Sequence, residues 1–422
     1  MGRLGELLSA RDREFRSQGN RVLHRAGPLR PELLLTLLLY QARAGNDRGY
    51  RHMLDAFWDE AAESGVELPR RDPVTAQAFC AARKKIPAHV VREILVAAAQ
   101  EFDAEFGQRL RWHGRRLLAI DGAWRHCRRS RELEREFGSD TGGHYPRMLI
   151  CTLFDVTAEI PIDAVVGHGS SSERHHLATL CRSVQPDDVV VIDRGFPSFD
   201  VFTSILSRRA DFVARLKKTQ GFKAATDFAA SGAKEAVVTL RRPRSARLPG
   251  GSEYIAVRLV RVERRGAGPW ILATSLHEDE FPADVIADAY ARRWRIEEFY
   301  GQLVADYCNQ EFFHAKSADG VRQEVFAQML FLVITRALMA DVAHTTGIPY
   351  THLSRKTAAL AAADGLVRML CVADPERTTH FLQRLLQRIA RTRERPRAGR
   401  SAPRRSFLPL RKWTPSGRRG RA

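Results

Sequence analysis

The sequence has few cysteines, and their spacing excludes several kinds of site. Six cysteines are scattered over 422 residues: Cys80, Cys127, Cys151, Cys181, Cys308 and Cys371. None of them forms a Cys-x-x-Cys pair or the cysteine and histidine spacing of a zinc site. A disulfide-stapled secreted domain and a zinc-finger module are therefore excluded, and a reduced cytoplasmic protein is expected.

Long hydrophobic runs are also missing. The two longest, residues 33–40 and 329–335, are far shorter than the roughly 20 apolar residues that a membrane-spanning helix needs. The N-terminus has no early apolar segment of the kind found in signal peptides. We therefore expect these runs to form buried helices, and we expect no association with a membrane.

Acidic residues are scarce relative to basic ones. The chain has 49 Asp and Glu against 68 Lys and Arg, which gives a formal net charge of +19. Residues 391–422 hold twelve of these cations and one acid, Glu394, so this segment carries +11 (12 − 1) and the rest +8 (19 − 11). Such an excess favours a polyanionic partner, namely nucleic acid or an acidic surface. Segment 391–422 is predicted to be a disordered tail that attracts phosphates, with a merely solubilising tail as the alternative.

Residues 1–108 are predicted to form a helical N-terminal domain. Within it, Thr75 is a candidate helix start, and Ile86-Pro87 separates the helix that follows from a second one. Lys84 and Lys85 lie on the basic rim of this helix pair. The pair resembles a helix-turn-helix that reads DNA. A plain helical packing domain is an equally good interpretation.

The middle of the chain alternates between strand and helix patterns, which indicates an α/β fold with a mixed sheet. Short runs rich in β-branched residues, separated by Pro/Gly turns, predict a β-rich insertion that interrupts this core. The predicted parts after the N-terminal domain are a core of residues 109–217 and 277–345, an insertion at 218–276, C-terminal helices at 346–390 and the tail at 391–422.

Residues 287–304 read as one helix with three functional side chains on one face. Tyr290, Arg293 and Glu297 lie at positions i, i+3 and i+7. At 100° per residue these side chains fall within about 60° of arc. This face therefore combines a phenol, a guanidinium and a carboxylate.

Two further acids each end a strongly apolar strand. Asp121 follows Leu-Leu-Ala-Ile, and Asp193 follows Val-Val-Val-Ile. Taken singly, the first could be an Asp-Gly turn and the second could pair with Arg194. A carboxylate at such a place costs desolvation free energy unless a cation compensates it. Together with Glu297, the two acids suit a pair of Mg²⁺ ions that promote in-line displacement at phosphorus.

Three sequence stretches resemble the DDE-class cut-and-paste DNA transposases of the insertion-sequence-four group. They are LLAIDGAW, VVVIDRGFPSFDVF and YARRWRIEEFYGQL, in that order. The acids within them are separated by 72 residues (193 − 121) and by 104 residues (297 − 193), and the larger gap holds the insertion. The resemblance covers roughly residues 70–345.

The resemblance implies a ribonuclease-H-like core in which Asp121, Asp193 and Glu297 bind two Mg²⁺ ions, for which Mn²⁺ substitutes. It implies double-stranded DNA as partner, both transposon ends and target, a homodimer in the DNA complex, and a bacterial, nucleoid-associated location. Tyr290 and Arg293 match positions that hold DNA phosphates. Further candidate DNA contacts are Trp270, which would stack on a flipped base, and Arg194, Lys84 and Lys85.

The sequence departs from the family pattern at one position. Where the family has a lysine seven residues after the glutamate, this chain has Val304, so a phosphate contact is missing or comes from another residue such as Lys316. Two alternatives to a transposase stay open. One is a ribonuclease-H-like nuclease without strand transfer, and the other is a non-catalytic DNA-binding protein derived from a transposase.

Overall fold

A five-stranded mixed sheet forms the centre of the fold. The computed structural model describes residues 29–43, 49–139, 143–217, 222–244, 252–264, 267–303, 313–371 and 375–394. The central strands are β1 (Leu117–His126), β2 (Arg147–Asp155), β3 (Ile160–His168), β4 (Val189–Ile192) and β5 (Asp211–Arg215). Strands β3, β2 and β1 are antiparallel neighbours, and β1, β4 and β5 are parallel neighbours. This order, with helices packed on the sheet, confirms the ribonuclease-H-like α/β fold.

The two strands that carry the candidate acids lie side by side. The Leu-Leu-Ala-Ile and Val-Val-Val-Ile runs are buried throughout, as expected for parallel strands covered on both faces. β4 ends before Asp193, as the sequence predicts. β1 does not end at Asp121 but continues to His126, because β2 stays paired with it as far as the His126–Arg147 pair. This long-range pairing overrides the local Asp-Gly turn signal.

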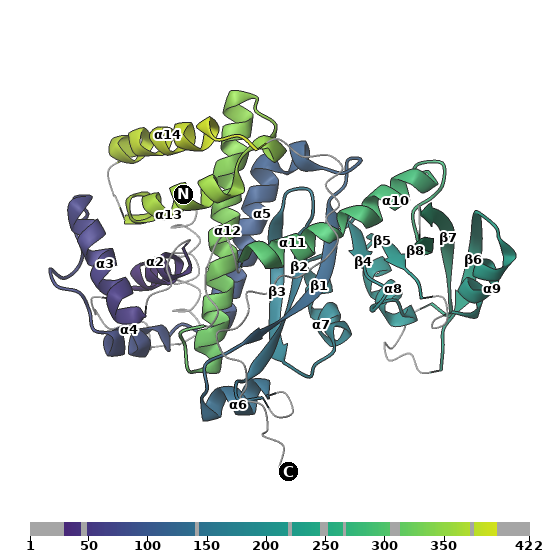
Figure 1. Cartoon of the computed structure of the whole chain (residues 1–422), viewed down its shortest axis with the longest axis horizontal. Coiled ribbons are helices and arrows are strands. Elements are labelled where there is room, and N and C mark those ends of the chain that lie inside the picture. The colour runs from purple at the N-terminus through teal and green to yellow at the C-terminus, as the bar shows by residue number, and fades with distance from the viewer. Residues whose placement is uncertain are drawn as a thin grey trace, which may run out of the picture.

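Segment 218–276 extends the central sheet. It contains α9 (Lys223–Ser231), β6 (Glu235–Arg241), β7 (Tyr254–Arg264) and β8 (Ala267–Thr274). β8 pairs with β5, so the three β-strands complete a continuous eight-stranded sheet of order β3-β2-β1-β4-β5-β8-β7-β6. Figure 1 shows these strands at the end of the molecule opposite to the N-terminal helices.

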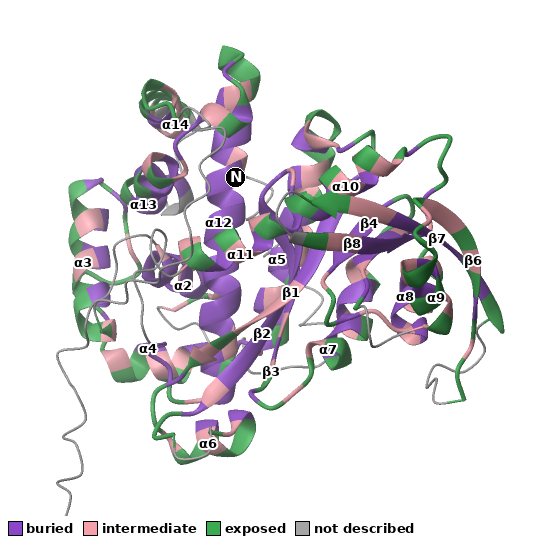
Figure 2. Cartoon of the chain, turned by 45° about the vertical axis from the view of Figure 1, so that its right-hand side comes forward, coloured by how far each residue is buried: buried purple, intermediate pink, exposed green. Residues whose placement is uncertain are grey.

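The remaining helices frame the sheet. The N-terminal part consists of α2 (Pro31–Ala42), α3 (Tyr50–Glu63), α4 (Ala76–Arg83) and α5 (Ala88–Phe106). Around the core lie α6 (Arg131–Phe137), α7 (Glu173–Leu180), α8 (Phe199–Leu206), α10 (Ala283–Arg292), α11 (Trp294–Gln302) and α12 (Ala318–Thr346), followed by α13 (Arg355–Cys371) and α14 (Pro375–Arg391). Short 3₁₀ turns occur at Gly107–Leu110, Cys181–Ser183 and Tyr350–His352. In both views α12 separates the helices α2–α4, α13 and α14 from the sheet (Figures 1 and 2).

Helix α12 is the central packing element of the helical half. By length and composition alone it could cross a membrane, and it contains the apolar run 329–335. However, 83% of its most apolar window is buried inside the protein. Figure 2 shows it buried along most of its length, where it packs against α2, α5, α13, α14 and β3. Run 33–40 likewise lies in a buried helix, α2.

The helix predicted at 287–304 is interrupted at Arg293. α10 ends at Arg292, and α11 begins at Trp294. The Arg293 amide donates to the Tyr290 carbonyl (3.2 Å), and the Ile296 amide donates to the Arg293 carbonyl (3.1 Å). This three-residue spacing tightens the turn as in a 3₁₀ helix. The backbone of Arg293 stays in the right-handed helical region, so the chain continues from α10 into α11. With neither Gly nor Pro before Gly301, the local sequence gives no sign of this break.

Candidate active site

The register of β1 and β4 brings the first two acids together. Ile120 pairs with Ile192 in the parallel ladder. The next residue along each strand direction is an aspartate, Asp121 or Asp193. Because parallel strands run in the same direction, the two carboxylates emerge at the same end of the sheet, where β4 stops. The carboxyl ends of adjacent parallel strands are a common place for ligand sites in α/β proteins.

The helix face predicted from the sequence faces these two acids. The Tyr290 hydroxyl donates to Asp193 Oδ1 at 2.9 Å. Arg293 Nη2 donates to Glu297 Oε1 at 2.8 Å, and its Nη1 lies 3.5 Å from Asp121 Oδ2. The tightened turn at Arg293 therefore leaves all three side chains on the side of the helix that meets the sheet. The structure thus links Asp121, Asp193 and Glu297 through one arginine and one tyrosine.

A buried tyrosine that the sequence motifs did not single out, Tyr300, holds α11 against the sheet at β1 and β2. The Tyr300 hydroxyl lies 2.9 Å from the Asp121 carbonyl oxygen and 2.9 Å from Thr152 Oγ1. Burial raises the pKa of this phenol well above its usual value, so it stays protonated and able to donate. The sequence feature that could have identified Tyr300 is its position three residues after Glu297, on a helix of aromatic and charged residues.

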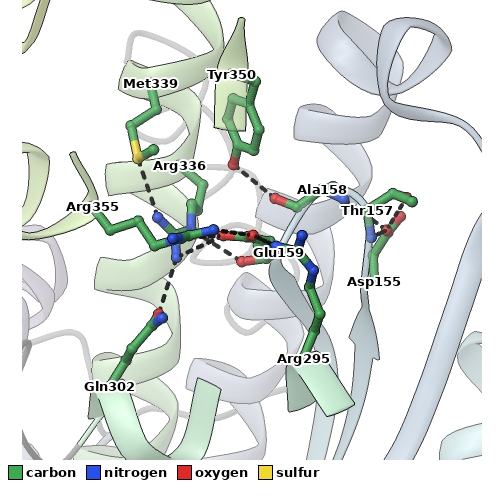
Figure 3. Close-up of polar contacts among 10 residues, drawn as sticks. All are labelled: Asp155, Thr157, Ala158, Glu159, Arg295, Gln302, Arg336, Met339, Tyr350 and Arg355. Atoms are coloured by element: carbon green, nitrogen blue, oxygen red, sulfur yellow. Dashed lines mark hydrogen bonds and ion pairs between the residues drawn. The ribbon is translucent and has the colours of Figure 1, made fainter. Parts of the chain in front are cut away.

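An arginine on the same helix anchors α11 to the rest of the molecule. Arg295, two residues before Glu297, forms an ion pair with Glu159, which lies in the turn between β2 and β3. Figure 3 shows that Glu159 also meets Arg336 of α12 and Arg355 of α13. The carboxylate of Glu159 thereby connects α11, α12 and α13 to the turn between β2 and β3. This cluster holds in place the helix that carries Glu297.

The first two acids experience different electrostatic surroundings. Burial, together with the nearby Glu297 and Asp193 carboxylates, raises the pKa of Asp121 to about 6, against the opposing effects of the Gly122 amide and Arg293. Burial would also raise the pKa of Asp193. Its hydrogen bonds from the Arg194 amide and the Tyr290 hydroxyl, together with the charge of Arg293, outweigh burial and lower that pKa. Asp193 is thus ionised at neutral pH, while Asp121 lacks full compensation of its charge.

A fourth acid, which the sequence motifs did not single out, lies near the same place. Glu173 is the first residue of α7. A Cβ atom on Gly122 would come within 2.5 Å of Glu173 Oε1. Burial, followed by the Asp121 and Asp193 carboxylates, raises the pKa of Glu173 to about 7. Only the tertiary structure places this carboxylate, at the start of a helix, beside Asp121.

The donor set fits a hard divalent cation. All four acids offer carboxylate oxygens, which are the ligands that Mg²⁺ prefers. Among the described residues, no three His, Cys, Asp or Glu side chains are arranged as a finished metal-binding cluster. The Arg293 guanidinium instead lies between Asp121 and Glu297 and supplies positive charge there. Burial, and after it the neighbouring carboxylates, raise the pKa values of Asp121 and Glu173, although Arg293 opposes both shifts.

A family model described as "Transposase DDE domain" matches residues 112–334, which is more than half of the chain. The chain belongs to the DDE transposase family. The matched region contains β1, β4 and α11 and therefore all three acids of the site. The transposase family expected from the sequence motifs is thereby confirmed.

Two Escherichia coli (strain K12) proteins are similar to this chain. The transposase InsG for insertion sequence element IS4 is 24% identical over 288 residues, covering 66% of this chain and 64% of that protein. The putative transposase InsZ is 27% identical over 148 residues, covering 34% of this chain and 48% of that protein. The chain thus spans less than two thirds of either relative. The match to InsG agrees with the resemblance to the insertion-sequence-four group.

A solved structure of another transposase has a partly similar shape. It is the piggyBac transposase synaptic complex with hairpin DNA, matched over 88% of this chain and 77% of that chain. The TM-score is 0.45, and the sequence identity is 11%.

The structure places two of the candidate DNA contacts beside the three acids. Arg194 directly follows Asp193 and is exposed. Trp270 of β8 lies edge-on to Tyr290, with 5.0 Å between ring centroids, and the Arg264 guanidinium lies 4.4 Å from the centre of its ring. Trp270 Nε1 is buried without a hydrogen-bond partner among the described residues. Trp270 is therefore next to the site, packed between the tyrosine and an arginine.

The other DNA candidates lie apart from the acids. Lys84 and Lys85 are exposed in the turn between α4 and α5, across α12 from β1 (Figure 1). Arg83, which directly precedes these two lysines, is instead buried and paired with Glu324 at 3.1 Å. Lys316 is exposed just before α12, and its carbonyl accepts a hydrogen bond from Ser130 at 2.8 Å. Val304 lies outside the described residues.

Proposed function

We propose that this chain is a metal-dependent DNA transposase that binds transposon inverted-repeat ends, cleaves DNA and transfers the freed strand by in-line phosphoryl transfer. The observation that carries the proposal is the Ile120–Ile192 register, which brings Asp121 and Asp193 together under Arg293 and Glu297. Family membership supports the same chemistry. The bound nucleophile is water in the first step and a 3′-hydroxyl in the second.

Asp121, Asp193 and Glu297 are the residues that would hold two Mg²⁺ ions, and Mn²⁺ would substitute. The two ions, when bound, activate the attacking oxygen and stabilise the leaving one. The chain's own cationic and phenolic groups position the DNA. Once bound cations neutralise these two carboxylates, the Arg293 guanidinium would be available to donate to a DNA phosphate. The Tyr290 hydroxyl, which here donates to Asp193, would be free to donate to the same phosphate once a cation binds that carboxylate.

The surface of the protein favours a DNA partner. The net charge of +19 would attract DNA. Further phosphate contacts, beyond those in the active site, would come from the exposed Arg194, Lys84 and Lys85. Trp270 would stack on a flipped base after rearranging its contact with Arg264. We propose a homodimer in the DNA complex and a cytoplasmic, nucleoid-associated location.

A strand-transfer assay tests the proposed function. The substrate is a labelled duplex that carries the inverted repeats flanking the gene, incubated with full-length protein, target plasmid and Mg²⁺. We expect cleavage at the repeat end and covalent joining of that end to the target. Cleavage without joining would instead identify a nuclease. Binding without cleavage, in Mg²⁺ and in Mn²⁺, would identify a non-catalytic DNA-binding protein.

Deleting the basic tail is expected to weaken DNA binding and flatten its salt dependence. The Glu394 backbone amide donates a hydrogen bond to the His352 carbonyl (2.7 Å), and the Ser354 hydroxyl donates to Glu394 Oε1 (2.6 Å). The deletion therefore begins at residue 395 and leaves these two hydrogen bonds intact. It removes ten cations, the twelve of 391–422 less Arg391 and Arg393, and no acid. For every phosphate that the shortened protein no longer neutralises, the slope of log affinity against log salt should fall by about 0.9.

The measurement is a series of fluorescence-anisotropy titrations with duplex DNA between low and physiological salt. Replacing the same ten cations by glutamine is the control for chain length. A slope unchanged by both variants would show that the tail only solubilises the protein.

A further inference from the structure

Glu173 is the one acid near the site that has no bonding partner in the described part of the chain. Asp121, Asp193 and Glu297 each interact with Arg293 or Tyr290. By contrast, no hydrogen bond or ion pair involves the Glu173 side chain among the described residues. The groups that act on it most strongly, apart from burial, are the carboxylates of Asp121 and Asp193. A half-buried acid placed against two other acids is unfavourable unless a cation joins them.

The local structure holds Glu173 in this unfavourable place. α7 packs against β1, β2 and β3. Its first turn is capped by the Ser172 hydroxyl, which accepts from the Arg174 amide. Arg174 Nε donates to the Gly195 carbonyl at 2.7 Å, in the loop that follows Asp193. These contacts tie the start of α7, and with it the backbone of Glu173, to the loop of the second acid.

Glu173 approaches the site from the side opposite to Glu297. Successive side chains of a strand point to opposite faces of the sheet. Asp121 meets Arg293, between α10 and α11, whereas a side chain on the next residue, Gly122, would meet Glu173 of α7. Since β4 ends at Ile192, no described strand pairs with this edge of β1 beyond Ile120. Side chains from either face of the sheet can therefore approach Asp121 along this edge. The absence of a side chain at Gly122 provides the space that the Glu173 carboxylate fills.

From this geometry we propose that Glu173 is a fourth acidic residue of the active site and a ligand of the divalent cation that Asp121 holds. The cation would thus lie between Glu173, at the start of α7, and Asp121, in β1. The proposal rests on the proposed metal-dependent function and adds a residue to its site. It also gives Gly122 a defined role, which is to leave room for this carboxylate.

A structural role for Glu173 is the competing explanation, because an acid in the first turn of a helix interacts favourably with the helix dipole. Glu32, in the first turn of α2, is a matched control in this respect. Like Glu173 it is partly buried, but it lies in the N-terminal helices. If Glu173 only stabilised its helix, Glu173→Gln and Glu32→Gln would lower the stability of the protein equally.

The experiment measures Mn²⁺ binding to the full-length protein without DNA, by the electron paramagnetic resonance signal of free Mn²⁺. Glu173→Gln is expected to weaken binding by about tenfold or more, whereas Glu32→Gln leaves it unchanged. Without metal, Glu173→Gln should unfold at a temperature no lower than Glu32→Gln, because it removes a carboxylate that two neighbouring carboxylates repel. Equal Mn²⁺ affinity of Glu173→Gln and the parent would overturn the inference.

A second pair of variants tests the position of Glu173 separately. Gly122→Ala should weaken Mn²⁺ binding severalfold in the parent, because the added methyl group displaces the carboxylate. In a Glu173→Ala background it should have no further effect, since nothing remains to be displaced. An equal weakening in both backgrounds would overturn the proposed role of Gly122 and of Glu173.

Asp193→Asn distinguishes failure of the inference from failure of the proposed function. If Asp193→Asn abolishes Mn²⁺ binding while Glu173→Gln retains it, the three-acid site stands and the fourth acid is rejected. If neither variant changes Mn²⁺ binding, the metal site itself is rejected and the inference with it.

Discussion

Replacing Asp193 by asparagine is expected to reduce metal-dependent DNA cleavage on the order of 10³-fold, because bound metal ions contribute several kcal/mol of transition-state stabilisation. Asn has almost the same volume and keeps one oxygen that can accept from the Tyr290 hydroxyl. The change therefore removes a charge rather than a contact. DNA binding in the absence of metal should stay within about twofold of the parent, since removing a negative charge does not oppose phosphate binding.

Asp187→Asn is the control for this prediction. Asp187 is exposed, lies just before β4 and has a positive φ of 65°, which asparagine tolerates well. Cleavage of labelled duplex under single-turnover conditions, and anisotropy without metal, provide the two readouts. Cleavage by Asp193→Asn at the parent's rate would reject the assignment of Asp193 to the catalytic site.

Replacing Glu159 by alanine is expected to lower the free energy of unfolding by about 3–5 kcal/mol, the usual cost of leaving buried charges without their partner. Glu159 and Arg336 are almost fully buried, and Arg355 Nε donates to Glu159 Oε2 at 2.6 Å. The variant would remove the carboxylate that Arg295, Arg336 and Arg355 share (Figure 3). Urea unfolding followed by circular dichroism measures the effect.

The same cluster predicts a pH dependence. Burial alone would raise the pKa of Glu159, but Arg336, Arg355 and Arg295 outweigh it and lower the pKa to about 2 from an ordinary value of 4.5. Because the folded-state pKa is depressed, the contribution of Glu159 is complete above pH 4.5 and disappears as the pH falls towards 2. The difference in stability between the parent and Glu159→Gln should therefore shrink across this range.

Glu298→Ala serves as the control for the stability prediction. Glu298 is exposed on the same helix, α11, so its removal should change the free energy of unfolding by no more than about 0.5 kcal/mol. A similar value for Glu159→Ala would show that the cluster does not hold α11 against the core.

Local patterns in the sequence were sufficient to predict the elements that carry the candidate site. The two apolar runs before Asp121 and Asp193 form adjacent buried strands, and the helix face with Tyr290, Arg293 and Glu297 meets them. These features are readable because strand burial and helix periodicity are properties of a few consecutive residues. The motifs and their order also determined the family, which the match over residues 112–334 confirms.

Contacts between distant parts of the chain decided the remaining features. The continuation of β1 past Asp121 depends on its pairing with β2, and the burial of Arg83 depends on Glu324, more than two hundred residues away in the sequence. The position of Glu173 beside Gly122 requires the packing of α7 on the sheet. A lone glutamate at a helix start carries no local signal of such a neighbour. The sequence by itself therefore determined which three acids to expect, whereas only the tertiary structure decided which other side chains surround them, because that depends on pairing and packing between residues far apart in the chain.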